Sequence, residues 1–209
     1  MYVHPAVDPG AWQALEKAAG GLYGVVVNAA DGPGDRVDPV FAAAAARLRG
    51  AGVRLLGYVD TGYGGRPLRA VLRDLRRHRA WYGTEGVFFD RVASGRAQLP
   101  YYRRLSAVAR LCAARTVVLN PGVHPDPGYA AVADLLVTFE GSWAQYLGAE
   151  VPTWTSAHPP ERFCHLVYGV PGGLGSRVAL TAARRGAAVH CAVPGSPPNP
   201  WSHAPETAA

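Results

Sequence analysis

The sequence predicts an α/β protein, a single (β/α)8 barrel of the TIM type with short loops. Short apolar runs recur without polar alternation, which is typical of parallel strands buried on both faces. These runs alternate with stretches whose apolar residues have helical spacing. Eight such units fit into 209 residues only if the connecting loops are short, because this is close to the lower size limit of the fold.

The apolar runs give the positions of the expected strands. Residues 86–90 read Gly-Val-Phe-Phe-Asp, and residues 135–140 read Leu-Leu-Val-Thr-Phe-Glu. Both runs end in a carboxylate. The carboxyl ends of the strands are where α/β folds carry their active sites. In order, we expect strands at residues 2–5, 21–28, 54–60, 86–90, 116–120, 135–140, 163–168 and 187–193.

Cap and turn residues separate these strands and start the helices. Asp38 is a suitable N-cap and Pro39 fits the first helical position, while Gly50 and Gly52 mark the end of that helix. Residues 67–79 carry leucines and a valine along one face and arginines on the other. We expect helices at residues 9–19, 39–49, 67–79, 100–113, 127–133, 142–147 and 174–185.

No charged run or linker divides the chain. We therefore expect one domain over residues 1–209, with an irregular Pro-rich tail from 194 to 209. An open, doubly wound sheet is the alternative architecture. It would leave two edge strands to protect, and none of the expected strands is polar or interrupted by proline in the way that suits an edge.

Composition argues against several classes of partner. The net charge is +6, but it comes almost entirely from arginine in an Ala-, Gly- and Pro-rich chain, so we expect no nucleic-acid binding. No apolar stretch is long enough to span a membrane. The first five residues have neither the basic nor the apolar part of a signal peptide, which predicts a cytoplasmic protein. The histidines and cysteines have no metal-ligand spacing, so we expect neither a metal nor a cofactor.

The strand ends supply the candidate functional residues, because all of them meet at one mouth of a barrel. Asp90 and Glu140 are the candidate catalytic pair, since glycoside hydrolysis needs two carboxyl groups that flank the bond. Amides and aromatic rings around two acids are typical of a sugar site. The candidate substrate-binding residues are His4, Asn28, Tyr58, Asp60, Tyr63, Arg66, Arg91, Asn120, Trp143, Tyr168, Asn199 and Trp201.

Two other interpretations stay open at this point. Asp90 or Glu140 could cap a helix or pair with an arginine, with no catalytic role. The segment 169–175, Gly-Val-Pro-Gly-Gly-Leu-Gly, follows a strand and opens a helix, which formally fits the loop of a nucleotide-dependent reductase. The strand that follows this loop carries no acid that could hold a ribose, which disfavours the reductase.

The sequence resembles spherulation-specific family 4, the spherulin-4-like barrel proteins. The matching segments follow the family order over nearly the whole chain: Asn28 with Gly32-Pro33-Gly34; residues 56–61 with Tyr63 and Arg66; Trp81-Tyr82; residues 86–90; Tyr101-Tyr102; residues 119–122; Ala133-Asp134; residues 137–140; and residues 198–201. Together these segments are far more specific than any one of them.

The resemblance implies a glycoside hydrolase. Family members with known activity cleave α-1,4-linked galactosamine or N-acetylgalactosamine polymers, so a polysaccharide or oligosaccharide is the expected substrate. The resemblance implies that Asp90 is the nucleophile or transition-state stabiliser and that Glu140 is the acid/base.

One position departs from the family. Members usually have a glutamate directly after the acid of this strand, where the present chain has Arg91. Arg91 could pair with Asp90 and lower its pKa, could silence the site, or could favour an anionic substrate. The alternative to a hydrolase is therefore a catalytically impaired glycan-binding protein on the same barrel.

Overall fold

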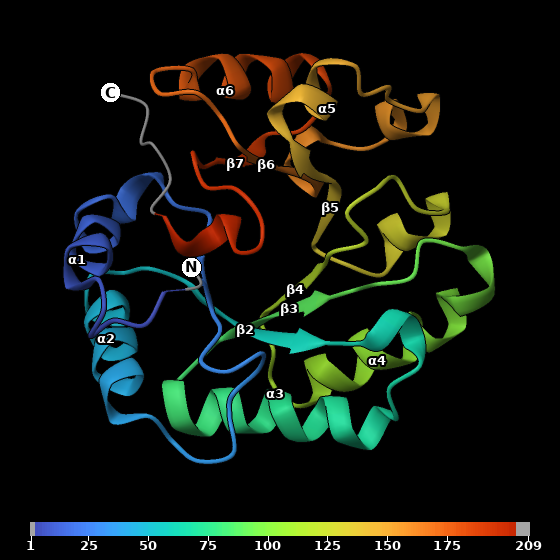
Figure 1. Cartoon of the computed structure of the whole chain (residues 1–209). Coiled ribbons are helices and arrows are strands. Elements are labelled where there is room, and N and C mark those ends of the chain that lie inside the picture. Colours follow the sequence, from blue (N-terminus) through green and yellow to red (C-terminus); the bar gives the residue numbers. More distant parts are fainter. Residues whose placement is uncertain (1–2, 204–209) are drawn as a thin grey trace.

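The computed structural model describes residues 3–203 and contains one sheet of seven parallel strands in chain order, surrounded by helices (Figure 1). Each strand pairs in parallel with the next one along the chain. The strands are β1 (Val25–Val27), β2 (Leu55–Asp60), β3 (Gly86–Asp90), β4 (Thr116–Leu119), β5 (Leu135–Ser142), β6 (Phe163–Tyr168) and β7 (Val189–Ala192).

The helices follow the expected order. Asp38 caps α2 as predicted, because its Oδ1 accepts hydrogen bonds from the backbone N–H groups of Val40 and Phe41. Residues 127–133, expected as an α-helix, contain a 3-10 helix at Pro127–Ala131. The α-helices are α1 (Pro9–Lys17), α2 (Pro39–Gly50), α3 (Leu68–Tyr82), α4 (Leu99–Leu111), α5 (Trp143–Leu147) and α6 (Gly175–Arg184).

The prediction of eight strands and a closed barrel is wrong. The expected first strand at 2–5 begins at residues that the structure does not describe, and its described part forms a turn. The N–H groups of Val7 and Asp8 both donate to the carbonyl of His4, and Pro5 has no N–H for a ladder. Between residues 3 and 203 no backbone pairing joins β7 to β1. The fold is a curled half-barrel.

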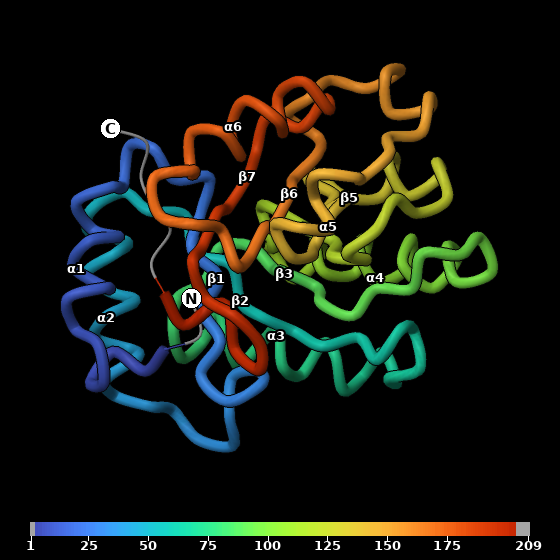
Figure 2. The backbone as a smooth tube through the Cα atoms, turned by 45° about the horizontal axis from the view of Figure 1, so that its top comes forward, coloured from blue at the N-terminus to red at the C-terminus, as the bar shows by residue number. Residues whose placement is uncertain are grey.

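The two faces of the curled sheet have different partners. The outer face packs on the helices, and its strand residues join helix residues in two large apolar clusters. The inner face is a core of strand and flanking residues, to which all seven strands contribute. It consists of Tyr23, Val26, Leu56, Tyr58, Phe88, Val118, Leu135, Val137, Cys164, Leu166 and Val189. The tube in Figure 2 shows the strands wrapping around this interior.

Strand alternation decides which polar residues face inwards. Because successive side chains point to opposite faces, Asp60 follows Tyr58 onto the inner face and Asp90 follows Phe88. Asn120 stands two residues after Val118, also an inner-face residue. These three polar residues therefore stand at the mouth of the curled sheet, the end at which its strands finish.

Glu140 reaches the inner face only through an irregularity in β5. Val137 faces inwards, so strict alternation would point Glu140 outwards. However, the pairing of β5 with β6 shifts between Val137 and Phe139, which leaves Thr138 without a partner in the register. After this bulge Glu140 pairs with Leu166, an inner-face residue. Bulges commonly redirect a side chain in this way.

No helix between residues 3 and 203 combines the length and the apolar character that crossing a membrane requires.

The contact between β2 and α3 predicts a stability effect. A Cβ atom at Gly57 would lie 2.7 Å from Cβ and Cγ of His78, which is itself buried. We expect Gly57→Ala to lower the free energy of unfolding by about 1–3 kcal/mol in urea denaturation. Gly50→Ala is the control, because nothing lies within 4 Å of its added carbon. Equal stability of the two variants would contradict the close contact.

Candidate active site

Asp90 and Glu140 meet through the amide of Asn120. Asp90 is the last residue of β3, Glu140 lies in β5, and Asn120 directly follows β4, the strand between them. Nδ2 of Asn120 donates to Oδ1 of Asp90 at 2.7 Å and to Oε2 of Glu140 at 2.5 Å. The two candidate acids, 50 positions apart in sequence, therefore share one donor nitrogen.

The orientation of the Asn120 amide is fixed from its other end. Its Oδ1 accepts the backbone N–H of Gly122 at 3.0 Å, so the NH2 group must point at the acids. Asn120 is buried, and one hydrogen goes to each carboxylate. The bonded oxygens of Asp90 and Glu140 can be no farther apart than these two bonds laid end to end.

Each acid has a second donor. The Tyr58 hydroxyl donates to Oδ2 of Asp90 at 2.7 Å, and the Trp201 indole donates to Oε1 of Glu140 at 3.1 Å. The Trp201 ring also meets Tyr168 edge-on, with the ring centroids 6.2 Å apart. The structure thus brings together the predicted residues Tyr58, Tyr168 and Trp201 with the acids.

The C-terminal segment is held across the end of β6. Gly169, directly after that strand, donates its N–H to the carbonyl of Gly195 at 2.7 Å. In both views the C-terminal segment (red) returns beside the first described residues of the chain (Figures 1 and 2). The region expected as an irregular tail therefore contributes Trp201 to the site, and the part of it from residue 204 onwards lies outside the described residues.

The surroundings of Glu140 favour its protonated form. Burial raises the pKa of Glu140, and the nearby charge of Asp90 raises it further, while the hydrogen bonds from Asn120 and Trp201 act in the opposite direction. Burial and the charge of Asp90 also raise the pKa of Tyr58, which keeps its hydroxyl protonated as a donor. The residues Asp90 and Glu140 are both partly exposed, so a substrate can reach them.

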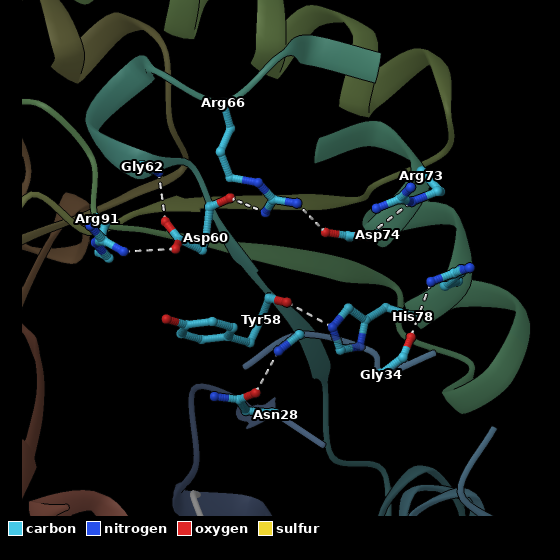
Figure 3. A network of polar contacts seen from close by, with 12 residues as sticks. Asn28, Gly34, Tyr58, Asp60, Gly62, Arg66, Arg73, Asp74, His78 and Arg91 are labelled. Atoms are coloured by element: carbon cyan, nitrogen blue, oxygen red, sulfur yellow. Dashed lines mark hydrogen bonds and ion pairs between the residues drawn. The ribbon is translucent and has the colours of Figure 1, made fainter. Parts of the chain in front are cut away.

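Arg91 forms an ion pair with Asp60 (Figure 3). Its Nη1 lies 3.0 Å from Oδ2 of Asp60, and its guanidinium stands 5.1 Å from the centroid of the Tyr63 ring. The other carboxylate oxygen of Asp60 accepts the N–H of Gly62 at 2.6 Å. The suggested ion pair between Arg91 and Asp90 is therefore wrong, and Asp60 holds Arg91 instead.

Arg66 is occupied within the fold. Its guanidinium donates to the carbonyl of Asp60 and to Oδ2 of Asp74, each at 2.6 Å, and thus ties the loop after β2 to α3 (Figure 3). The Tyr101 hydroxyl donates to the Arg66 carbonyl at 2.9 Å. These contacts support a structural role for Arg66 more strongly than the predicted contact with a substrate.

Four further predicted residues take up local positions in the fold. Nε2 of His4 bonds Asp38 at 3.1 Å and its ring contacts Phe41, which places His4 at the start of α2 and not at a strand end. Oδ1 of Asn28 accepts the N–H of Gly32 and so holds the turn after β1. Trp143 starts α5, and its ring centroid lies 6.2 Å from that of Tyr146. Asn199 precedes the short helix Pro200–Ser202.

Thr61 is a residue that the strand-end analysis overlooked. It is fully buried, and its hydroxyl lies within hydrogen-bond distance of the carbonyls of Asp90 and Arg91 and of the Tyr102 hydroxyl. The run Val-Asp-Thr at the end of β2 carried a signal for this role, because a small hydroxyl next to a strand end can bond to neighbouring carbonyls.

Among residues 3–203 no group of three or more His, Cys, Asp or Glu side chains is arranged to hold a metal ion. A surface hollow of about 410 Å³ lies beside the start of α4, lined by residues that include Arg96, Arg103 and Asp126. It contains neither Asp90 nor Glu140, so the candidate site rests on the geometry of the acid pair and not on this hollow.

Comparison with known proteins gives the family. A model described as spherulation-specific family 4 matches residues 1–201. The chain belongs to this family. Spherulin-4 from Physarum polycephalum is 29% identical over 164 residues, which are 76% of this chain and 48% of that protein. The chain thus spans about half the length of this relative.

Solved structures agree with the family assignment. The structure described as Aspergillus clavatus Sph3 in complex with GalNAc has a TM-score of 0.82 and 28% identity, over 98% of this chain and 90% of that one. Deoxyribose phosphate aldolase from Aeropyrum pernix has a TM-score of 0.53 at 15% identity, over 89% and 80% of the two chains. The aldolase supports the fold alone.

The contact of Trp201 with Glu140 predicts a measurable change in this family member. An indole N–H stabilises the ionised carboxylate, so Trp201→Phe should raise the pKa of Glu140 further. Side-chain NMR titration of 13C-labelled glutamate measures this pKa. Trp81→Phe, on α3, is the matched control and should leave the Glu140 pKa unchanged. An unchanged value in Trp201→Phe would show that the indole does not hold the carboxylate.

Proposed function

We propose that the protein is a glycoside hydrolase. Its expected substrate is a polysaccharide that contains α-1,4-linked N-acetylgalactosamine or galactosamine. The observation that carries this proposal is the pair Asp90 and Glu140, held together by Asn120. The likeness to a family member solved with GalNAc supports a sugar as the ligand.

The environments of the two acids support different roles. Burial and the neighbouring Asp90 raise the pKa of Glu140, as a general acid requires. Asp90 accepts hydrogen bonds from Tyr58 and Asn120, which hold its carboxylate oxygens in place. Glu140 would protonate the leaving oxygen, and Asp90 would attack the anomeric carbon or stabilise its positive charge.

The shared donor favours a retaining reaction. Bonds of 2.7 and 2.5 Å to one nitrogen keep the bonded oxygens of Asp90 and Glu140 close together. Retaining enzymes have carboxyl groups about 5–5.5 Å apart, whereas inverting ones need ~6.5–9.5 Å to admit a water. The arrangement leaves no such space between these two oxygens.

The contacts of Arg91 weaken one ground for the alternative, an impaired glycan-binding protein. That alternative rests on Arg91 in place of the family glutamate, and pairing with Asp90 was one way in which Arg91 could affect the site. Arg91 instead engages Asp60, and Asp90 keeps two hydrogen-bond donors. We therefore favour a hydrolase that retains its catalytic groups over a binding protein that has lost them.

Conservative replacement of each acid tests the proposal. We expect Asp90→Asn and Glu140→Gln each to lower kcat on α-1,4-linked N-acetylgalactosamine oligosaccharides by roughly 10²–10⁴-fold, because each removes one carboxylate role. Release of reducing ends measures the rate. Glu85→Gln is the control, since Glu85 pairs with Arg115 just before β3, at the end of the strand remote from Asp90. Wild-type rates in both acid variants would refute the assignment.

The stereochemical outcome is a separate test. If Asp90 forms a covalent intermediate, the first product from an α-linked oligosaccharide should be the α-anomer. Proton NMR of the anomeric signals during the first minutes of hydrolysis distinguishes it from the β-anomer. Initial formation of the β-anomer would leave a hydrolase in place but would exclude Asp90 as a nucleophile.

A further inference from the structure

Tyr63 and Arg91 both have a backbone conformation that side chains rarely adopt. Their φ angles are 54° and 49°, in the left-handed region. Such conformations cost on the order of 1–3 kcal/mol each and persist where the surrounding structure imposes them, often at functional sites. Both residues belong to loops at the mouth, after β2 and β3 respectively.

A buried network imposes these two conformations. The N–H of Tyr63 donates to the Arg91 carbonyl at 2.7 Å, and the N–H of Thr61 donates to the Asp90 carbonyl at 3.0 Å. The Thr61 hydroxyl donates to the Arg91 carbonyl at 2.8 Å. These hydrogen bonds thus connect the loops after β2 and β3, and the backbone carbonyl of Asp90 accepts one of them.

The network presents a charged and an aromatic group to solvent. The Arg91 side chain is 52% exposed although it pairs with Asp60, and Tyr63 is 58% exposed. Asp60 stands beside Asp90 in the register of β2 and β3. An Arg guanidinium has five N–H donors, so an arginine that is half exposed keeps donors for a ligand next to the acid pair.

The charges at this position favour an acidic sugar. Asp60 alone would attract a cationic amino sugar, but Arg91 neutralises it. The guanidinium fork matches a carboxylate in geometry and charge, and the Tyr63 ring offers an apolar face to a sugar. The net charge of +6 would also raise the local concentration of an anionic polymer.

We propose that Asp60, Tyr63 and Arg91 form a subsite for a sugar residue that carries a carboxylate, next to the sugar held at Asp90 and Glu140. This inference rests on the proposed glycan-binding function and adds a substrate class to it: a polymer in which N-acetylgalactosamine is joined to a uronic acid. Arg91 provides the specificity, and the Thr61 network holds it in place.

Calorimetry with two matched ligands tests the subsite. One is a synthetic oligosaccharide in which α-1,4-linked N-acetylgalactosamine is joined to a uronic acid. The other is its carboxyl-reduced form, in which the carboxylate is a neutral hydroxymethyl group. We expect the wild-type protein to bind the acidic form roughly five- to tenfold more tightly, as expected for a charge-assisted contact that is partly exposed.

Three variants test whether Arg91 causes the preference. Arg91→Gln should bind both oligosaccharides equally. Arg69→Gln removes the same charge from an exposed position on α3 and should keep the preference. Arg91→Lys retains the positive charge but lacks the paired N–H donors of the guanidinium, so it should keep part of the preference for the acidic ligand. It gives a second measurement if Arg91→Gln fails to fold.

Several results would overturn the subsite. They are equal affinity of the wild-type protein for the two ligands, no binding of either, or an unchanged preference in Arg91→Gln. The assay measures binding and not turnover, so its result is independent of the hydrolysis assay. A uronate preference without hydrolysis would refute the proposed reaction alone, and hydrolysis without the preference would refute the subsite alone.

Discussion

One amide nitrogen sets the geometry on which the site depends. Two carboxylates on β3 and β5 would repel each other, and Nδ2 of Asn120, directly after the strand between them, gives one hydrogen to each. The backbone N–H of Gly122 prevents the amide from turning over. The closeness of the acids and the expected stereochemistry both follow from this bridge.

The rule that residues at the carboxyl ends of parallel strands form the site predicted most of its residues, but it did not explain the direction of Glu140. A parallel strand that ends in an acid places that acid at the mouth, and this rule was sufficient for Asp60, Asp90 and Asn120. It was not sufficient for Glu140, whose inward direction depends on the bulge at Thr138. A bulge depends on the pairing of two strands, so the sequence of one strand does not reveal it.

Other errors arose where tertiary contacts decided the outcome. The order of the strands and α-helices between residues 3 and 203 was readable from apolar runs and caps, but the described part of the first predicted strand is a turn around the His4 carbonyl. Pairing of Arg91 with Asp90 was one of three possibilities that the sequence left open. The left-handed backbone of Arg91 directs it to Asp60, and a φ value imposed by the Thr61 hydroxyl is not visible in the sequence.

The bond between Trp201 and Glu140 joins residues 61 positions apart, with the indole on the later one. During translation the carboxylate leaves the ribosome well before its partner exists. At about 5–20 residues per second, the interval is on the order of seconds. A nascent chain can therefore fold most of its sheet while the acid still lacks this donor, and Glu140 acquires its final ionisation behaviour only after Trp201 has been made and has reached it.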